Sequence, residues 1–302
     1  MTLAITGGTG FVGQAVLDLL RQRSMAARAL ARTVPSDRPE VDWVAGSLAD
    51  TAALDQLVDG ASAILHIAGL TNAPDPAHFA AANVGGTAAM IAAARKAGID
   101  RFVFVSSLAA REPSLSAYGA SKAAAEALVA QSGLDWTIVR PPAVYGPRDT
   151  DMLELFRAAR FGIVPLPPGG ATSLIHAEDL ARLLCDLPAA GREAWAKTFE
   201  PDDGRTGGWS HKEMARAIGM AMGRRVWAPH CPATLLSLAA RGDRIIRGDK
   251  AKLTPDRVGY MCHPNWVSHS NRRVPPEVWA PDIETREGLR STARWYREHS
   301  WL

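Results

Sequence analysis

Residues 1–13 read Met-Thr-Leu-Ala-Ile-Thr-Gly-Gly-Thr-Gly-Phe-Val-Gly, and this stretch decides the fold. Gly7, Gly10 and Gly13 stand at G-x-x-G-x-x-G spacing, after the apolar run 3–5 and before the helical pattern 12–20. Glycine permits a tight turn and lets the backbone approach a phosphate closely, while a helix N-terminus offers unpaired N–H groups. The stretch therefore predicts a strand–loop–helix unit that binds a dinucleotide pyrophosphate. A tight turn without a cofactor is the alternative.

The composition is that of an ordinary globular chain. It has 302 residues, of which 47% are hydrophobic and 22% charged, and a net charge of +3. Without a long basic run, this charge does not indicate a nucleic-acid or membrane-surface partner. No leader pattern and no apolar run of the ~18 residues that a membrane span needs is found, so we expect a cytoplasmic protein. A homodimer is left open. The spacing of the three cysteines and eight histidines indicates no disulfide framework and no metal site.

Strand-like and helix-like segments alternate through the first half of the chain. The expected strands are 3–5, 27–31, 41–44, 63–67, 101–106 and 136–139, and the expected helices are 12–22, 51–58, 80–96 and 117–131. This alternation predicts an α/β fold with a Rossmann-type, doubly wound parallel sheet. Residues 173–176 and 177–187 are expected to add one more strand and helix to that sheet.

The second half has a different pattern. Helices are expected at 151–160, 211–222, 233–241 and 285–299, joined by loops that contain proline and glycine. They predict a small, mainly helical C-terminal substrate lobe. We assign residues 1–150 and about 171–200 to an NADP-binding Rossmann domain, and residues 151–170 and about 201–302 to the substrate lobe.

Tyr118 and Lys122 are four residues apart on one face of an expected helix. A tyrosine phenol is a poor base at neutral pH because its pKa is about 10, and a neighbouring ammonium lowers that pKa. Ser106 and Ser107 end a buried strand, where open α/β sheets bind their ligands. A serine there can stabilise charge on a substrate oxygen, although a strand-end cap is an equally simple explanation.

With these segments the chain resembles the extended short-chain dehydrogenase/reductases, a group that includes nucleotide-sugar epimerases and enzymes like 3β-hydroxysteroid dehydrogenase and dihydroflavonol reductase. The similarity rests on segments in the family's order along nearly the whole chain. They are residues 6–13 (TGGTGFVG), 66–69 (HIAG), 83–87 (NVGGT), 105–107 (VSS), 118–122 (YGASK), 140–147 (RPPAVYGP), 175–181 (IHAEDLA) and 287–297 (EGLRSTARWYR).

The resemblance implies a role for each matching residue. Tyr118 would be the acid/base, Lys122 its partner, and Ser107 the binder of the substrate oxygen, with Ser106 as the fallback. Further substrate candidates are Thr71, Tyr145 and His176, the last with a structural role as the alternative. The implied cofactor contacts are Gly7, Thr9, Gly10, Phe11, Val12, Gly13, Arg32, Ser47, Leu48, His66, Ala68, Gly69, Asn83, Ser106, Tyr118, Lys122, Pro141, Pro142 and Val144.

Two positions depart from the family's pattern. Ser47 stands where many members have an aspartate that contacts adenine, so this contact is expected to be weaker. The segment between Ser107 and Tyr118 is shorter than usual, which changes one wall of the substrate site without excluding the three catalytic side chains.

Cofactor choice is indicated at the end of the second expected strand. NAD enzymes usually place an acid there, whereas this chain has Arg32 and no acid before Asp37. A planar guanidinium suits a 2′-phosphate, which favours NADP over NAD, and a solvated surface arginine is the alternative.

We expect an NADP-dependent oxidoreductase that reduces a carbonyl or oxidises a secondary alcohol of a small to medium organic substrate. The apolar segment 232–240 favours a less polar substrate, although a core helix would explain it too. A nucleotide-sugar epimerase or dehydratase with the same catalytic residues is the nearest alternative. A non-catalytic NADP-binding subunit of an assembly is the alternative from another class.

Overall fold

The computed structural model describes residues 2–248, 251 and 253–302, and the chain divides into two compact units. Unit 1 comprises Met1–Arg140, Leu180–Glu200 and Val274–Trp279, and unit 2 comprises Pro141–Asp179, Pro201–Arg273 and Ala280–Leu302. Residues 141–150 and 171–179, which we had assigned to the NADP-binding domain, therefore fall in unit 2. Which unit binds which ligand stays a prediction.

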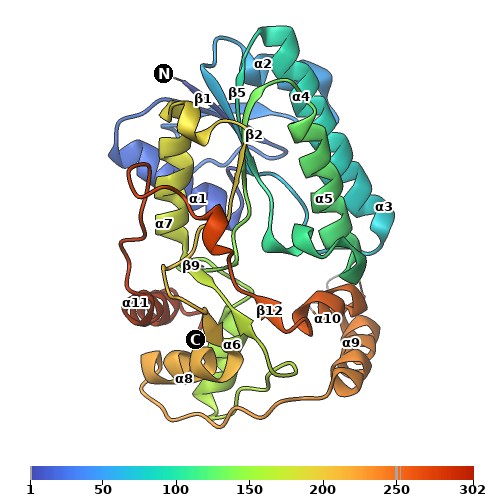
Figure 1. The fold of residues 1–302 in the computed structure, drawn as a ribbon, viewed down its shortest axis with the longest axis vertical. Coiled ribbons are helices and arrows are strands. Elements are labelled where there is room, and N and C mark those ends of the chain that lie inside the picture. Colours follow the sequence, from blue (N-terminus) through green and yellow to red (C-terminus); the bar gives the residue numbers. More distant parts are fainter. Residues whose placement is uncertain (1, 249–250, 252) are drawn as a thin grey trace. The chain divides into compact units, whose positions relative to one another are not determined.

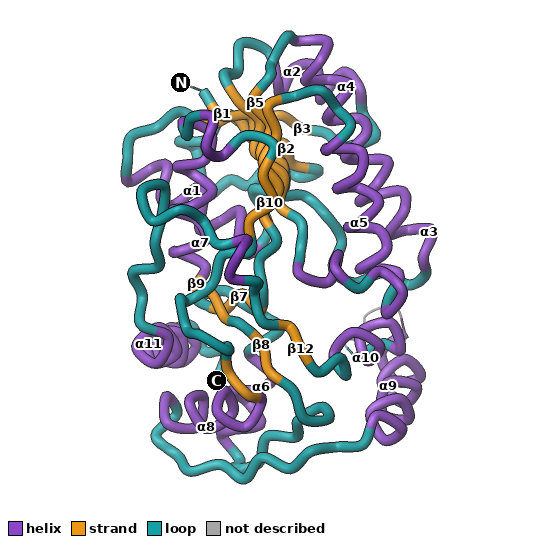
Figure 2. The backbone as a smooth tube through the Cα atoms, viewed as in Figure 1, coloured by secondary structure: helices purple, strands orange, loops and turns teal. Residues whose placement is uncertain are grey.

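Unit 1 is built on a seven-stranded parallel sheet with the order β10-β6-β5-β4-β1-β2-β3 (Figures 1 and 2). The strands are β1 (Leu3–Thr6), β2 (Ala27–Ala31), β3 (Asp42–Ala45), β4 (Ala63–His66), β5 (Arg101–Val105), β6 (Asp135–Val139) and β10 (Lys197–Phe199). Strand order reverses where β1 lies between β2 and β4, and open α/β sheets bind ligands beyond the carboxyl ends of such strands. The predicted doubly wound parallel sheet is confirmed.

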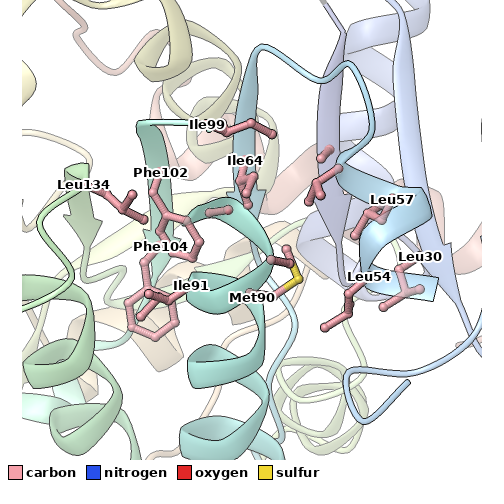
Figure 3. Packing of buried hydrophobic residues seen from close by; sticks show 14 of the residues in the cluster. Leu30, Leu54, Leu57, Ile64, Met90, Ile91, Ile99, Phe102, Phe104 and Leu134 are labelled. Atoms are coloured by element: carbon pink, nitrogen blue, oxygen red, sulfur yellow. The ribbon is translucent and has the colours of Figure 1, made fainter. Parts of the chain in front are cut away.

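Helices α1 (Phe11–Gln22), α2 (Thr51–Val58), α4 (Gly86–Ala97) and α5 (Ala117–Ala130) belong to unit 1, together with most of α7 (Ala177–Asp186). Helices α2, α4 and α5 cover one face of the sheet, and Figure 3 shows side chains of α2 and α4 packed against the strands. Leu54, Met90, Phe102 and Phe104 are nearly solvent-free there. Each such side chain stabilises the fold by about 1.5–3 kcal/mol through burial, so this layer fixes where α5 lies.

One expected helix is interrupted. The alanine-rich stretch predicted as a single helix over 80–96 contains a π-helical turn, Ala80–Gly85, between α3 (Pro76–Phe79) and α4. The helix ends as expected at Gly98, whose φ of 68° is easy for glycine. The wider turn carries Asn83, and π-turns within helices are frequent at functional sites.

Among its described residues, unit 2 contains short strands and five α-helices of its own. Strand β7 (Ala143–Tyr145) pairs with β9 (Leu174–His176), and β8 (Ala171–Thr172) lies between β11 (Trp209–Ser210) and β12 (Asn265–Trp266). The helices are α6 (Leu153–Arg160), α8 (His211–Ala221), α9 (Ala233–Arg247), α10 (Pro255–Met261) and α11 (Thr285–Glu298). Their shared core includes Tyr145, Phe156, Leu289 and Tyr296.

The expectation that 173–176 joins the main sheet is wrong. That segment pairs with β7 in a separate two-stranded sheet, and the seventh strand of the main sheet is β10 instead. Helix α9 also continues six residues beyond the predicted end at Arg241, and α10 was not predicted.

Candidate active site

The glycine loop forms the tight turn that its spacing predicts. Gly7 has a φ of 77°, and a Cβ atom there would lie 2.6 Å from the Ala68 nitrogen. A Cβ on Gly13 would lie 2.0 Å from the Gly7 oxygen, so only glycine fits at either position. Thr9 and Gly10 are exposed at the start of α1, where first-turn N–H groups lack partners within the helix. This narrow backbone cradle at a helix N-terminus fits a pyrophosphate.

His66 is a fully buried link between β4 and the helix that carries Asn83. Thr87 Oγ1 donates to the Asn83 carbonyl at 2.6 Å, so it accepts from His66 Nε2 at 3.1 Å. His66 Nδ1 is then the acceptor for the Thr6 hydroxyl at 2.6 Å. Burial, with a smaller effect of the Lys122 ammonium, lowers the pKa of His66 to about 3. Both ring nitrogens are used by the protein, so a cofactor would meet only the backbone here.

Asn83 joins the end of β4 to α5. Its Oδ1 accepts from the Leu70 N–H at 2.7 Å, and its Nδ2 donates to the Leu70 carbonyl at 3.0 Å and to Ser121 Oγ at 2.9 Å. Ser121 in turn donates to the Tyr118 carbonyl at 2.7 Å. Asn83 therefore fixes the first turn of α5, the turn that carries Tyr118.

Lys122 is almost completely buried near the carboxyl end of β5. Its Nζ donates to the Val105 carbonyl at 2.9 Å and lies 5.1 Å from the centre of the Phe104 ring. Burial lowers the pKa of Lys122 to about 8, and the Glu126 carboxylate opposes this shift. A Cβ on Gly69 would lie 2.9 Å from Nζ, so glycine leaves room for the ammonium.

The two serines differ in what their hydroxyl groups can do. Ser106 is buried and donates to Glu126 Oε1 at 2.5 Å. Ser107 is partly exposed, and its Oγ accepts from the Ala109 N–H at 3.2 Å. Among the described residues, none accepts the Ser107 hydroxyl proton. Ser107 is thus a strand-end cap and still has a proton to donate, whereas Ser106 has not.

A buried ion-pair network lies behind these serines and was missed by the sequence analysis. Arg140, which follows β6, contacts both carboxylate oxygens of Glu126 at 2.8 and 2.6 Å and Glu200 Oε1 at 3.4 Å. Arg111 contacts the other Glu200 oxygen at 3.2 Å. Burial lowers the pKa of Arg140, but its bonds to the two carboxylates outweigh this and raise it. The available signal was spacing, because Glu126 is four residues after Lys122, as Lys122 is after Tyr118.

Four other predicted site residues of unit 1 lie in the loops after β2, β3 and β4. Arg32 is exposed after β2 and has no ion pair with any described residue. Ser47 caps its own loop, its Oγ accepting from the Ala49 N–H at 3.3 Å. Leu48 packs against Gly86, where a Cβ would lie 2.5 Å from the leucine. Thr71 is exposed in the loop after β4.

Unit 2 contains the remaining predicted residues. Pro141, Pro142 and Val144 lie at the start of this unit, Pro141 buried and the other two partly exposed. Tyr145 is not open to a substrate: its side chain is fully buried and its hydroxyl donates to the Thr285 carbonyl at 3.3 Å. A Cβ on Gly288 would lie 2.6 Å from that hydroxyl. The substrate role expected of Tyr145 is therefore wrong, because the side chain belongs to the core.

His176 keeps an unused donor. Its Nδ1 accepts from the Glu178 N–H at 3.3 Å, and burial lowers the pKa of the ring to about 4 despite the opposing charge of Asp179. The neutral ring therefore carries its proton on Nε2, which is buried without a hydrogen-bond partner among the described residues. The ring packs edge-on against Tyr145, with 5.2 Å between ring centres.

The chain is similar to a known protein family and, along almost its whole length, to named reductases. Residues 3–193 match the model of the NAD dependent epimerase/dehydratase family. A "Ceramide reductase" of Caulobacter vibrioides is 36% identical, over 99% of this chain and 96% of its own length. A "2-alkyl-3-oxoalkanoate reductase" of Stenotrophomonas maltophilia is 29% identical, over 96% of this chain and 98% of its own.

A partial sequence match and a solved structure are also similar to this chain. A "4-hydroxy-2-methyl-3-oxo-4-farnesyl-3,4-dihydroquinoline-1-oxide ketoreductase" of Stigmatella aurantiaca is 33% identical, over 53% of this chain and 57% of its own length. A crystal structure described as gox2253 superimposes with a TM-score of 0.78 at 23% identity, covering 100% of this chain and 99% of that one. This likeness concerns the fold alone.

Proposed function

The chain belongs to the NAD dependent epimerase/dehydratase family, and from this premise we propose that it is an NADPH-dependent reductase of a ketone on a long-chain, largely apolar substrate. It is an enzyme of the extended short-chain dehydrogenase/reductase type that uses a nicotinamide cofactor. The ketone, the preference for NADPH and the catalytic residues are the proposal.

The observation that carries the proposal is the group of side chains at the carboxyl end of β5. Lys122 uses one of its three N–H donors on the Val105 carbonyl, which leaves donors for the ribose hydroxyls and a positive charge near the first turn of α5. Ser107 donates its free proton to the substrate oxygen. Tyr118 gives its phenolic proton to the same oxygen as negative charge develops there. The bound cofactor supplies the hydride.

The names of the relatives support the substrate class. All three name reductases, two of the names contain a 3-oxo group, and those two also describe alkyl or farnesyl groups. The exposed Arg32 supports NADPH, since a guanidinium binds a phosphate through several donors.

We predict that purified protein oxidises NADPH when given 3-oxoalkanoates, and faster as their alkyl chains lengthen. Tyr118→Phe is expected to lower kcat by about 10²–10⁴-fold because the proton donor is lost. Ser107→Ala is expected to lower it by about 10²–10³-fold because one donor to the developing oxyanion is lost. The measurement is the loss of NADPH absorbance.

Tyr145→Phe is the matched control, since it removes a hydroxyl that serves only the core of unit 2 in the described contacts. Its turnover should stay within about threefold of wild type, because one neutral hydrogen bond contributes little to a folded protein. Turnover of UDP-glucose without net NADPH oxidation, or unchanged turnover by Tyr118→Phe, would contradict the proposal.

A further inference from the structure

Helix α9 presents its apolar side to solvent. It packs against α10 (Figure 1), and Ala240 is the one fully buried residue among its described side chains. The exposed fractions are 53% for Leu235, 64% for Leu238, 85% for Ile245 and 82% for Ile246. At 3.6 residues per turn these four side chains share an arc of roughly 100°, opposite Ala240. We call these four residues the α9 apolar arc.

This arrangement is the reverse of an ordinary surface helix, whose apolar stripe faces the protein. It also differs from what segment 232–240 led us to expect. The segment was interpreted as favouring a less polar substrate or as a core helix, yet Leu235 and Leu238 are exposed.

Positive charge is concentrated in the same stretch of the sequence. Residues 241–252 contain five basic residues and two acidic ones, while the other 290 residues contain 29 of each sign. The whole positive excess of the chain therefore lies in and just after the second half of α9. Arg241 is exposed and flanks the apolar arc on the helix surface, and Arg247 pairs with Asp243 at 3.2 Å.

We propose that α9 is an interfacial helix that docks on an anionic lipid surface, its apolar arc entering the boundary between headgroups and acyl chains. A second copy of this chain would bring another positively charged helix against α9. Four side chains on one helix are also far fewer than the roughly 20–30 residues that each side of a stable protein interface uses. An anionic lipid surface satisfies both the apolar arc and the charge.

The inference goes beyond the proposed function but rests on it in one respect, because a long-chain apolar substrate partitions into membranes. Docking would bring the enzyme to that substrate. Among the described residues, no helix is both long and apolar enough to cross a bilayer. The low overall charge had led us to expect no membrane partner. The net charge of all 302 residues does not reveal the local positive excess at residues 241–252.

The test is sedimentation of the full chain with vesicles, without NADPH or substrate. We expect binding to equimolar phosphatidylglycerol and phosphatidylcholine vesicles, little binding to pure phosphatidylcholine, and weakening by added salt. Ile245→Gln with Ile246→Gln should weaken binding at least about tenfold, because two largely exposed side chains no longer leave water. Arg241→Gln should weaken it by about fivefold.

Met220→Gln is the matched control, since Met220 is an exposed apolar residue on another helix of the same unit. It should bind as wild type does. Three results would overturn the proposal: no binding to the anionic vesicles, unchanged binding by the double variant, or a wild-type dimer that the double variant dissociates. Turnover is measured separately, so an inactive protein that binds vesicles contradicts only the proposed function, and an active protein that does not bind contradicts only the docking.

Discussion

At the scale of single residues, the buried ammonium of Lys122 lowers the stability of the folded chain at neutral pH. Its folded pKa of about 8 lies below the ordinary value of 10.5, so between these values the unfolded chain binds more protons than the folded one. The stability of the wild type therefore rises with pH through this window. A charged lysine at this buried position lowers the free energy of unfolding at pH 7. An apolar side chain there would avoid this loss.

At pH 7, Lys122→Met is expected to have a free energy of unfolding up to about 3 kcal/mol above that of the wild type. The loss of the hydrogen bond to the Val105 carbonyl reduces this gain. The advantage should disappear as the pH approaches 10.5. Urea unfolding of both proteins at the two pH values measures it. A variant less stable than wild type at pH 7, or an advantage independent of pH, would show that burial of the charge is not the cause.

Arg32 is the residue on which the cofactor preference depends. Arg32→Ala should weaken NADPH binding by about 10–100-fold and leave NADH binding nearly unchanged, because a charge-assisted bond to the 2′-phosphate is worth about 1.5–3 kcal/mol. Titration by fluorescence measures both affinities, with Arg21→Ala as an exposed control. Equal affinities for NADH and NADPH in the wild type, unaffected by Arg32→Ala, would refute the preference.

At the scale of elements, the ion pairs of Arg140 join the carboxyl ends of β5, β6 and β10 to α5. Glu126 is central, because one of its oxygens holds Ser106 and its charge opposes the lowering of the Lys122 pKa. We therefore assign Glu126 as a positioning residue for Ser107 and Lys122.

Glu126→Gln should lower kcat by at least about tenfold, since misplaced catalytic groups lose much of their effect. It should also move the alkaline limb of the pH–rate profile to lower pH, because the carboxylate no longer raises the pKa of Lys122. Glu126→Asp keeps the charge and should leave the limb in place. If the alkaline limb of the pH–rate profile is the same in Glu126→Gln as in wild type, Glu126 has only a packing role.

Elements with clear periodicity could be predicted from the sequence, and short ones could not. The strands of the first half and α5 carry continuous apolar runs or helical spacing, and they are confirmed to within a few residues. Strands β8, β11 and β12 have two residues each, too few for any pattern. The π-turn at Ala80–Gly85 was hidden because a run of alanine suits any helix.

At the scale of the whole molecule, pairing across long sequence distances limited the prediction. Residues 173–176 have the pattern of a strand, but nothing local says whether they pair with β7 or with the main sheet. Whether a side chain is exposed also depends on segments far away in the sequence. The burial of Tyr145 and the exposure of the apolar side of α9 were therefore not predicted. The helical spacing of Tyr118 and Lys122 was predictable because both residues belong to one helix, whereas the ion pairs of Glu126 on the same helix were missed.

The central claim is that this chain transfers hydride from NADPH to a ketone and does not merely bind the cofactor or return the hydride to the same carbon. The most direct measurement uses NADPH deuterated at both C4 positions, a 3-oxoalkanoate, and mass spectrometry of the product. We predict one deuterium in the product alcohol for each NADPH oxidised, and none with Tyr118→Phe on the same time scale. An unlabelled product, or conversion of a nucleotide sugar with no net oxidation of NADPH, would contradict the account.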